Sequence, residues 1–528
     1  MYGHHQSKKL FVAMNSMNRT IYLGALVALS VMQATAQEMN QQKYQLADER
    51  QLWSESRNAA GLAHDMQDST DNRGVAYFDL QHQSGDYHRV QEGNQQNQLR
   101  FFTERYQKIG KYLVGYGSFD FDMGRIKERA WSDVMRTYNS NPFISGSDIF
   151  GKYDFQNFTL NAKLTSVRLG HWNYGASLYY KVGDLSRLRD PRSRSRLADY
   201  QLTPSVTYTT GSHTVGLAGW YHRYKEKMMT PVVKQKDPHI KYYLMTGVDY
   251  AKGNVGDYAG YQREYVNHEF GGELSYGVRS GNVAGVTALT LRHGTEYAYG
   301  QYKYEPGTYY TYHYGATSRW TVTAGTLLHS ISASLDYEQA YADEYNSQLI
   351  TEKDGAYTTQ RWERTMTFKK RYQLKKADLA LHYRLSFTAD DAVKGFVGAS
   401  YDLQSVSNKH LLATSQLEYG SSLFGLEGGY GLLNGSLWVK AHADYHLKSK
   451  ADLDLHFEDG DYAVNVLQPD MEYYGANWWR GRLEITYQLP VTIKKQRTLW
   501  FAKVYGSYLK TDNSLDSKHA GIAVGVYY

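Results

Sequence analysis

The feature that most constrains the fold is a period-two alternation of apolar and polar residues, which recurs from about Gly74 to the last residue. The clearest segments are 172–182, 378–387, 437–447 and 479–489. An ordinary half-buried sheet accounts for one or two such segments. A whole chain of them needs water on one face and a very large apolar environment on the other. A closed barrel in a membrane supplies both and leaves no unpaired edge in lipid.

Composition agrees with that prediction. The mean hydropathy is −0.61, yet aromatic residues make up 15% of the chain and tyrosine alone accounts for 50 residues. Outside the first 36 residues, no apolar run approaches the ~20 residues of a spanning helix. Transmembrane β-barrels combine these properties, because only alternate residues face lipid and aromatic residues form girdles at both interfaces. We therefore expect an all-β protein, an antiparallel transmembrane β-barrel of the outer-membrane type.

The connections between the alternating segments vary in length. Short connections are expected at 109–111, 209–213, 280–282 and 324–325, and long ones at 125–148, 185–199, 225–260, 341–361 and 449–470. Outer-membrane barrels have short periplasmic turns and long extracellular loops. If both termini lie in the periplasm, the strand number is even, and the segments predict about 18 strands, with 14 to 18 as the range.

The first 36 residues have the pattern of a secretory signal peptide. Lys8, Lys9 and Arg19 precede the apolar stretch IYLGALVALSVM, and cleavage is expected after Ala36. Translation starting at Met1 gives a long basic region, so Met14 and Met17 are alternative starts. Residues 37–73 then form a polar N-terminal segment, periplasmic or inserted into the lumen, and residues 74–528 form the barrel. Within the polar segment, 48–62 is expected to form one short helix.

Two parts of the chain carry resemblances to known families. The stretch SRNAAGL, residues 56–62, resembles the N-terminal Asn-Pro-Ala-Gly element of FadL-like hydrophobic-compound channels, with Ala59 in place of the proline. With its Tyr-rich strands and terminal aromatic residue, the mature chain resembles uncharacterised single-chain outer-membrane barrels of Gram-negative bacteria, a domain of unknown function. That resemblance implies localisation in the outer membrane and a TonB-linked transporter or a surface lipoprotein as a partner.

The chain ends on an alternating segment, HAGIAVGVYY. Such a strand must pair with the first strand to close a barrel. Val524, Val526 and Tyr528 resemble the C-terminal signal read by the outer-membrane assembly machinery, which is a second implied partner. Gly521, Ala523 and Gly525 on the opposite face leave room for packing against the closing strand.

Alternation also predicts which polar residues face the lumen. The candidate lining residues are Lys440, His442, Asp444, His446, Arg480, Arg482, Glu484, His382 and Arg384. Rings of charged side chains set pore selectivity; the alternative is a wet interior whose charges pair with one another. His442, Asp444 and His446 are metal-ligand types, but Lys440 beside them opposes a cation, so we expect no metal site.

An arginine-rich segment, SRLRDPRSRSRLAD, predicts a second kind of site. Its candidate residues are Arg187, Arg189, Arg192, Arg194 and Arg196. On an extracellular loop they would bind anionic groups such as the phosphates of membrane lipid or lipopolysaccharide; the alternative is a solvated loop. The net charge of +6 comes with no nucleic-acid-binding motif, so nucleic acid is not an expected partner.

The sequence gives no sign of catalysis. It contains no cysteine, no G-x-S-x-G and no H-E-x-x-H motif, and the adjacent Asp390 and Asp391 fall in a short turn. We expect no enzyme and no cofactor. The first functional hypothesis is a porin-like channel or a component of a nutrient-uptake system. The second is a structural or assembly subunit that binds other envelope proteins or surface glycans through Tyr-rich loops such as 305–315.

Overall fold

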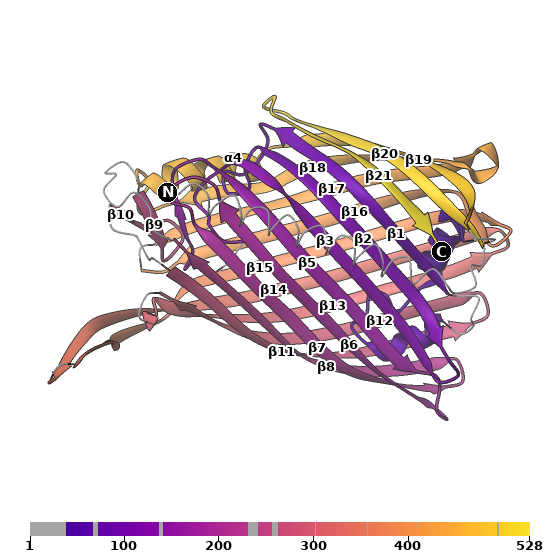
Figure 1. The fold of residues 1–528 in the computed structure, drawn as a ribbon, viewed down its shortest axis with the longest axis horizontal. Helices are drawn as coiled ribbons and strands as arrows, with labels where there is room; N and C mark the ends of the chain where they lie inside the picture. Colours follow the sequence, from indigo (N-terminus) through magenta and orange to yellow (C-terminus); the bar gives the residue numbers. More distant parts are fainter. Residues whose placement is uncertain are drawn as a thin grey trace, which may run out of the picture.

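The protein is a closed antiparallel β-barrel of 18 strands (Figure 1). The computed structural model describes residues 39–66, 72–136, 141–230, 241–255, 262–300, 303–355, 357–412, 414–493 and 496–528. Each barrel strand pairs with its neighbours in chain order, and β21 pairs with β1 to close the barrel. The predicted fold class and the strand number of about 18 are confirmed.

The barrel strands are β1 (Arg73–Gly85), β2 (Gln95–Ile109), β3 (Leu113–Arg129), β5 (Gly151–Ser166), β6 (Trp172–Arg187), β7 (Arg194–Thr210), β8 (His213–Met229), β11 (Gln262–Ser280), β12 (Val283–Tyr299), β13 (Gly307–Ala324), β14 (Leu327–Asp354), β15 (Tyr357–Ala389), β16 (Ala392–His410), β17 (Ser415–Leu432), β18 (Leu437–Asp454), β19 (Trp478–Ile493), β20 (Gln496–Thr511) and β21 (Asp516–Tyr527).

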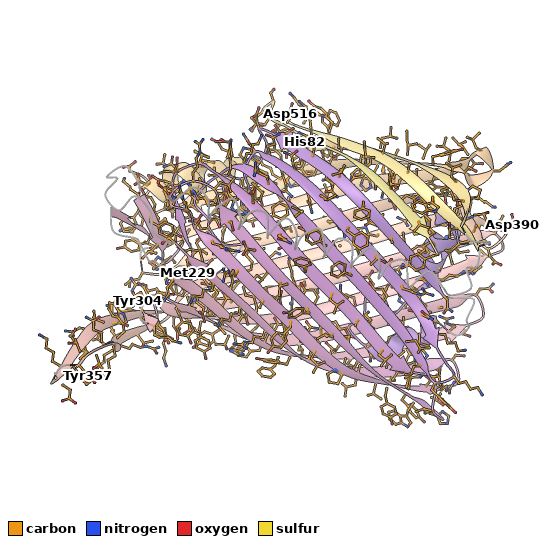
Figure 2. All side chains as sticks on the ribbon, viewed as in Figure 1. His82, Met229, Tyr304, Tyr357, Asp390 and Asp516 are labelled. Atoms are coloured by element: carbon orange, nitrogen blue, oxygen red, sulfur yellow. The ribbon has the colours of Figure 1, made fainter. Side chains whose placement is uncertain are left out.

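Large apolar and aromatic side chains cover the outside of the barrel (Figure 2). Exposed examples on most of the strands are Phe78, Leu160, Leu178, Leu202, Leu217, Leu274, Leu289, Tyr314, Ile331, Leu381, Phe424, Leu426, Tyr445, Leu483, Val504 and Ile522. Exposing such an apolar surface to water would cost free energy, whereas exposing it to lipid does not. Among the described residues, no helix is long and apolar enough to cross a membrane.

The two ends of the barrel differ. At the short-turn end, strands are joined by tight connections such as 211–212 and 281–282; the other end, the long-loop end, carries the longer excursions. Two predicted long loops are wrong, since 185–199 and 341–361 lie largely in strands. Most of 341–361 belongs to β14 and β15, which pair from Tyr345↔Thr367 to Asp354↔Tyr357, past the last partners on β13 and β16. This projecting ribbon extends away from the barrel (Figure 1).

Residues 39–66, called the plug below, lie inside the barrel near the short-turn end (Figure 1). They contain α2 (Gln41–Arg50), the 3₁₀ turn η1 (Ala59–Gly61) and α3 (Leu62–Asp65). The single helix expected over 48–62 is wrong. Helix α2 begins earlier because the Asn40 side chain accepts a hydrogen bond from the Lys43 N–H, an ordinary N-cap. After α2, the plug takes the conformation that its contacts with the barrel wall impose, and it does not continue as one helix.

Loop elements fill the long-loop end and form what is called the outer cap below. It comprises the small sheet β4 (Ser145–Ser147), β9 (Lys241–Met245) and β10 (Ala251–Val255), with η5 (Ala463–Leu467) and α4 (Gln468–Tyr474). Buried Trp131, Phe143, Tyr243 and Tyr462 belong to the same apolar cluster as side chains of the barrel wall. The outer cap is therefore packed against the wall.

Candidate functional site

A cavity of about 380 Å³ lies between the plug and the barrel wall from β13 to β19 and is called the lumen cavity below. Glu49 of the plug and Arg319 of β13 contribute to it. Several residues expected in the lumen also line it, namely His382, Arg384, His442, Asp444, Arg480 and Arg482. Alternation along β15, β18 and β19 places these side chains together although they are far apart in sequence.

Several charged groups of the lumen cavity are paired with one another. Arg384 donates from Nε to Oε1 of Glu427 at 2.9 Å, and its Nη1 lies 3.4 Å from Oε1 of Glu49 in the plug. Asp444 accepts from Arg480 Nε at 2.7 Å and contacts the His442 ring. The charges of the cavity wall therefore largely compensate one another. The contact between Arg384 and Glu49 connects this network to the plug.

The other predicted lining residues lie outside the lumen cavity. Lys440 Nζ is 3.7 Å from Glu427, and Glu484 is 3.8 Å from Lys503 on β20. His446 is nearer the long-loop end, where its Nδ1 is 3.0 Å from the Ala476 carbonyl and its ring stacks on Trp478. Among the described residues, no group of three or more His, Asp or Glu side chains could hold a metal ion.

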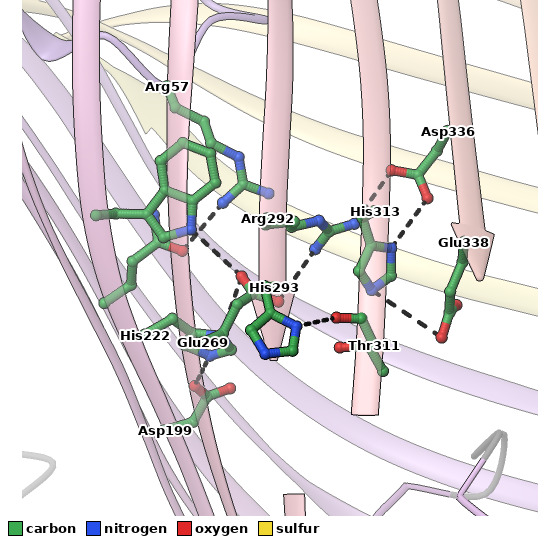
Figure 3. Close-up of polar contacts among 12 residues, drawn as sticks. Arg57, Asp199, His222, Glu269, Arg292, His293, Thr311, His313, Asp336 and Glu338 are labelled. Atoms are coloured by element: carbon green, nitrogen blue, oxygen red, sulfur yellow. Dashed lines mark hydrogen bonds and ion pairs between the residues drawn. The ribbon is translucent and has the colours of Figure 1, made fainter. Parts of the chain in front are cut away.

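A second polar network, which the sequence patterns missed, crosses the wall from β7 to β14 (Figure 3). Asp199 contacts His222 at 2.6 Å, and Glu269 lies 3.8 Å from both His222 and Arg292. From Arg292 the network continues to Asp336, which contacts His313, and His313 in turn contacts Glu338. These residues come from β7, β8, β11, β12, β13 and β14, so only strand register brings them together.

The segment SRNAAGL holds the plug against β6, β7, β8 and β11. Glu273 accepts hydrogen bonds from the Ser56 hydroxyl and, at 2.9 Å, from the Arg57 N–H. Asn58 Nδ2 donates to the Val206 carbonyl at 3.1 Å. Gly175 allows close approach here, because a Cβ at this position would lie 2.4 Å from the Ala60 nitrogen. The likeness of this segment to FadL-like channels stays a prediction.

Ion pairs connect the plug to other strands. Asp48 contacts Arg73 of β1 at 3.0 Å, Glu55 contacts Arg319 at 3.3 Å, and Asp65 lies 3.9 Å from Arg279. Burial raises the pKa of Asp48 to about 6, with Arg73 acting in the opposite direction. Burial also raises the pKa of Asp65 to about 6, although the backbone N–H groups of Trp53 and Leu52 oppose the shift.

The arginines predicted as an anion site are divided between strands and loop. Arg187 ends β6 and is buried, donating to Tyr153 Oη at 2.9 Å and to the Ile149 carbonyl at 2.6 Å. Arg194 and Arg196 lie on β7 and both approach Asp184, at 2.7 and 3.8 Å. Arg189 and Arg192 lie in the connection, and Arg192 contacts Asp190. Arg187 is thus committed to internal contacts; anion binding by the rest stays a prediction.

The predicted C-terminal signal lies at the closure of the barrel. Tyr528 and Gly74 exchange two backbone hydrogen bonds, of 2.7 and 3.0 Å. Val524 is exposed to the outside, whereas Val526 is buried. The small residue Gly521 faces Tyr505, whose ring a Cβ would approach to 2.3 Å. The expected room beside the closing strand is therefore occupied by a neighbouring aromatic ring.

A closed barrel with an apolar, aromatic outer surface and a charged interior defines a transmembrane β-barrel protein of the outer-membrane type. The chain belongs to the family described as "Family of unknown function (DUF6850)", whose sequence profile matches residues 59–528. No curated protein sequence matches this one.

Solved structures similar to the chain include three outer-membrane proteins. The ferric yersiniabactin uptake receptor FyuA from Yersinia pestis has 10% identity and a TM-score of 0.40, covering 87% of this chain and 80% of that chain. The copper transporter OprC has 10% identity and a TM-score of 0.39, covering 86% and 81%. The outer membrane protein OpdK from Pseudomonas aeruginosa has 10% identity and a TM-score of 0.35, covering 87% and 100%.

Proposed function

We propose that the protein is a gated uptake channel in the outer membrane of a Gram-negative bacterium. The short-turn end faces the periplasm, and the plug closes the lumen on that side. The outer cap closes the extracellular side. The observation that carries the proposal is that two separate elements, each held to the wall by non-covalent contacts, occupy the two ends of the barrel, while the lumen cavity lies between the plug and the wall.

The kind of contact that holds the plug supports the proposal that the plug can move out of the lumen. The plug is attached through ion pairs with Arg73, Arg279, Arg319 and Arg384, in addition to small apolar clusters such as Leu46 with Trp438. Ion pairs that hold one element against another can be exchanged for water when the element leaves, at far lower cost than a large apolar interface. A signal from the periplasm, such as contact with a TonB-linked transporter, would act on this element.

Single-channel recording in a planar bilayer tests the proposal. Three proteins are compared: the wild type, a variant lacking residues 39–66, and a variant that also has residues 457–474 of the outer cap replaced by a short Gly-Ser linker. We expect little conductance from the wild type, more from the plug deletion and most from the double variant. Silence of all three folded barrels would reject the channel.

The projecting ribbon favours a second candidate function, binding of another envelope protein or a surface glycan. Its outer part has strand edges with no neighbour on β13 or β16. Its tip carries Tyr357, which is 79% exposed, and Met366 near its base is 53% exposed. Unpaired strand edges accept an added strand from a partner. A stable partner that co-purifies in mild detergent with the intact chain and is lost on ribbon truncation would favour this function.

A further inference from the structure

A second cavity, of about 350 Å³, lies between the outer cap and the barrel wall and is called the outer cavity below. Its lining includes Tyr372 and Tyr419 of the wall and Tyr462 and Tyr474 of the cap. This volume is at the lower end of the range for small-molecule sites, which are concave and present a few polar groups among aromatic and apolar walls. The lumen cavity is lined by different residues.

The cationic side chains of the outer cavity are each paired with a carboxylate, and its remaining charged residue, Glu338, lies 4.0 Å from His313. Arg89 is paired with Asp470 at 3.0 Å and Arg136 with Glu296 at 2.9 Å, and Lys376 Nζ lies 2.8 Å from Asp378. Binding a charged molecule would require one of these pairs to be broken, which is costly where the pair is buried. The lining therefore fits a ligand without net charge.

Two acceptor oxygens of the lining have no hydrogen-bond donor within the described part of the chain. They are Oδ1 of Asp470 and Oδ1 of Asn408. Asp470 is 5% exposed, so its oxygen is removed from bulk water. A buried acceptor left unpaired costs free energy, which a donor on a bound molecule would restore. Both residues line the same cavity as the four tyrosines, whose rings are apolar with a polar edge.

We propose that the outer cavity binds a neutral carbohydrate of monosaccharide or disaccharide size. Its hydroxyl groups donate to Asp470 and Asn408 and accept from the nearby cationic and amide donors, since a hydroxyl does both. Its apolar ring face packs on the tyrosine side chains. The site does not require the lumen to open, so binding stands apart from the gated-channel proposal.

Isothermal titration calorimetry on the folded full chain in detergent tests the site. The neutral probes are glucose, N-acetylglucosamine, maltose, cellobiose and lactose, and the anionic probe is glucose 6-phosphate. We expect at least one neutral sugar to bind with a Kd below about 1 mM and the anionic probe to bind more weakly. Failure of every neutral sugar, or tighter binding of the anionic probe, would overturn the proposal.

Two variants locate the binding. Asn408→Ala removes one free acceptor, and we expect affinity to fall about tenfold, which corresponds to one lost hydrogen bond. Leu417→Trp fills the cavity, of which Leu417 is a lining residue, and should abolish binding. The matched control is Asn161→Ala, an amide on β5 that bonds Ser118 and lies outside the cavity. Binding that survives both cavity variants would place the sugar elsewhere and reject the site.

The same preparations separate this site from the channel. Sugar binding by a barrel that never conducts would retain the site and reject the channel. Conductance of the double variant described above, together with no sugar binding by the wild type, would retain the channel and reject the site.

Discussion

Arg73, the first residue of β1, donates from Nη2 to Oδ1 of Asp48 in the plug at 3.0 Å. The Arg73 guanidinium also lies over the Tyr106 ring at 4.1 Å and is 3% exposed as a residue. One cation thus joins helix α2 to the strand that begins the barrel. The guanidinium is buried, whereas the Asp48 side chain is 49% exposed, so the pair fixes where α2 lies against β1 and stays open to exchange with water.

The variant Arg73→Met should loosen the plug. It removes a charge-assisted hydrogen bond to Asp48, whose side chain is 49% exposed, and the guanidinium contact with the Tyr106 ring, at a cost of about 1.5–3 kcal/mol. The chain has no cysteine, so a single Ser56→Cys substitution reports plug exposure through its rate of maleimide labelling; Ser56 is 3% exposed when docked. The control is Arg125→Met, which breaks an exposed pair with Asp154 and should not change labelling. Equal rates in both variants would show that Arg73 does not hold the plug.

Gly175→Ala should displace the plug from its position without breaking the barrel. The added Cβ would meet the Ala60 nitrogen at 2.4 Å and backbone atoms of Ala59 and Ala60 at 2.8 Å. We therefore expect higher conductance than the wild type, with the heat-modifiable migration of a folded barrel retained. Gly117→Ala is the matched control, because its Cβ would meet only the Asn161 carbonyl, at 3.9 Å. A Gly175→Ala barrel that stays as silent as the control would indicate that η1 does not limit conduction.

Plug docking should weaken as pH rises from about 4 to 7. The pKa values of Asp48 and Asp65 are raised to about 6 by burial, so both docked carboxyls hold protons that the released plug loses. Their contribution is fully present below the ordinary carboxyl pKa and is lost as pH rises through about 6. His64 acts in the opposite direction, since burial lowers its pKa to about 4, and its contribution is lost as pH falls from about 6.5. Two carboxyls exceed one imidazole, so the net direction follows the carboxyls.

Charged groups of the barrel wall act on the pKa values of Asp48, Asp65 and His64. Arg73, Glu104 and Arg319 act on Asp48, while Arg279 acts on both Asp65 and His64 and Arg168 on His64. The measured quantity is the labelling rate of Ser56→Cys divided by that of the exposed Ser54→Cys, which cancels the thiol's own titration. The ratio should rise with pH in the wild type and rise less in Asp65→Asn. A ratio that falls with pH would contradict the assignment.

The barrel could be predicted because each lipid-facing strand repeats an apolar residue at every second position, as Leu381 and Leu385 do on β15. The same periodicity placed His442, Asp444 and Arg480 on the inner face. It could not predict the network of Asp199, His222 and Glu269, since adjacency across strands depends on register, which turn lengths set only approximately. It also failed for the projecting ribbon. There, Glu352 and Glu363 on one face and Lys353 and Arg364 on the other leave neither face apolar, because neither face meets lipid or a core.

Removing the projecting ribbon should leave the barrel intact. Replacing residues 346–367 by a short Gly-Asn turn deletes strand pairs that neither β13 nor β16 contacts. We expect the fraction of heat-modifiable folded barrel and its melting temperature to be unchanged, because the main apolar clusters lie elsewhere. A barrel that no longer folds would assign the ribbon a structural role in place of a partner-binding one.

Tyr528 should matter more for assembly in cells than for intrinsic stability. Its backbone bonds to Gly74 survive any side-chain change, whereas its ring packs over Gly74 and its Oη lies 3.1 Å from Thr103 Oγ1. Tyr528→Ala removes these contacts and those of the side chain with the Glu104 carbonyl and the Arg105 guanidinium, so the folded fraction after refolding into detergent should fall modestly.

If Tyr528 is also read by the assembly machinery, the amount of folded Tyr528→Ala barrel in cell envelopes should fall about tenfold more than the refolded fraction does, which corresponds to about 1.4 kcal/mol of lost recognition. Tyr528→Phe keeps the aromatic ring and should behave nearly as the wild type. The control is Tyr430→Ala, which removes an outward tyrosine that is 61% exposed on β17. Equal losses in cells and in detergent for Tyr528→Ala would limit this residue to closing the barrel.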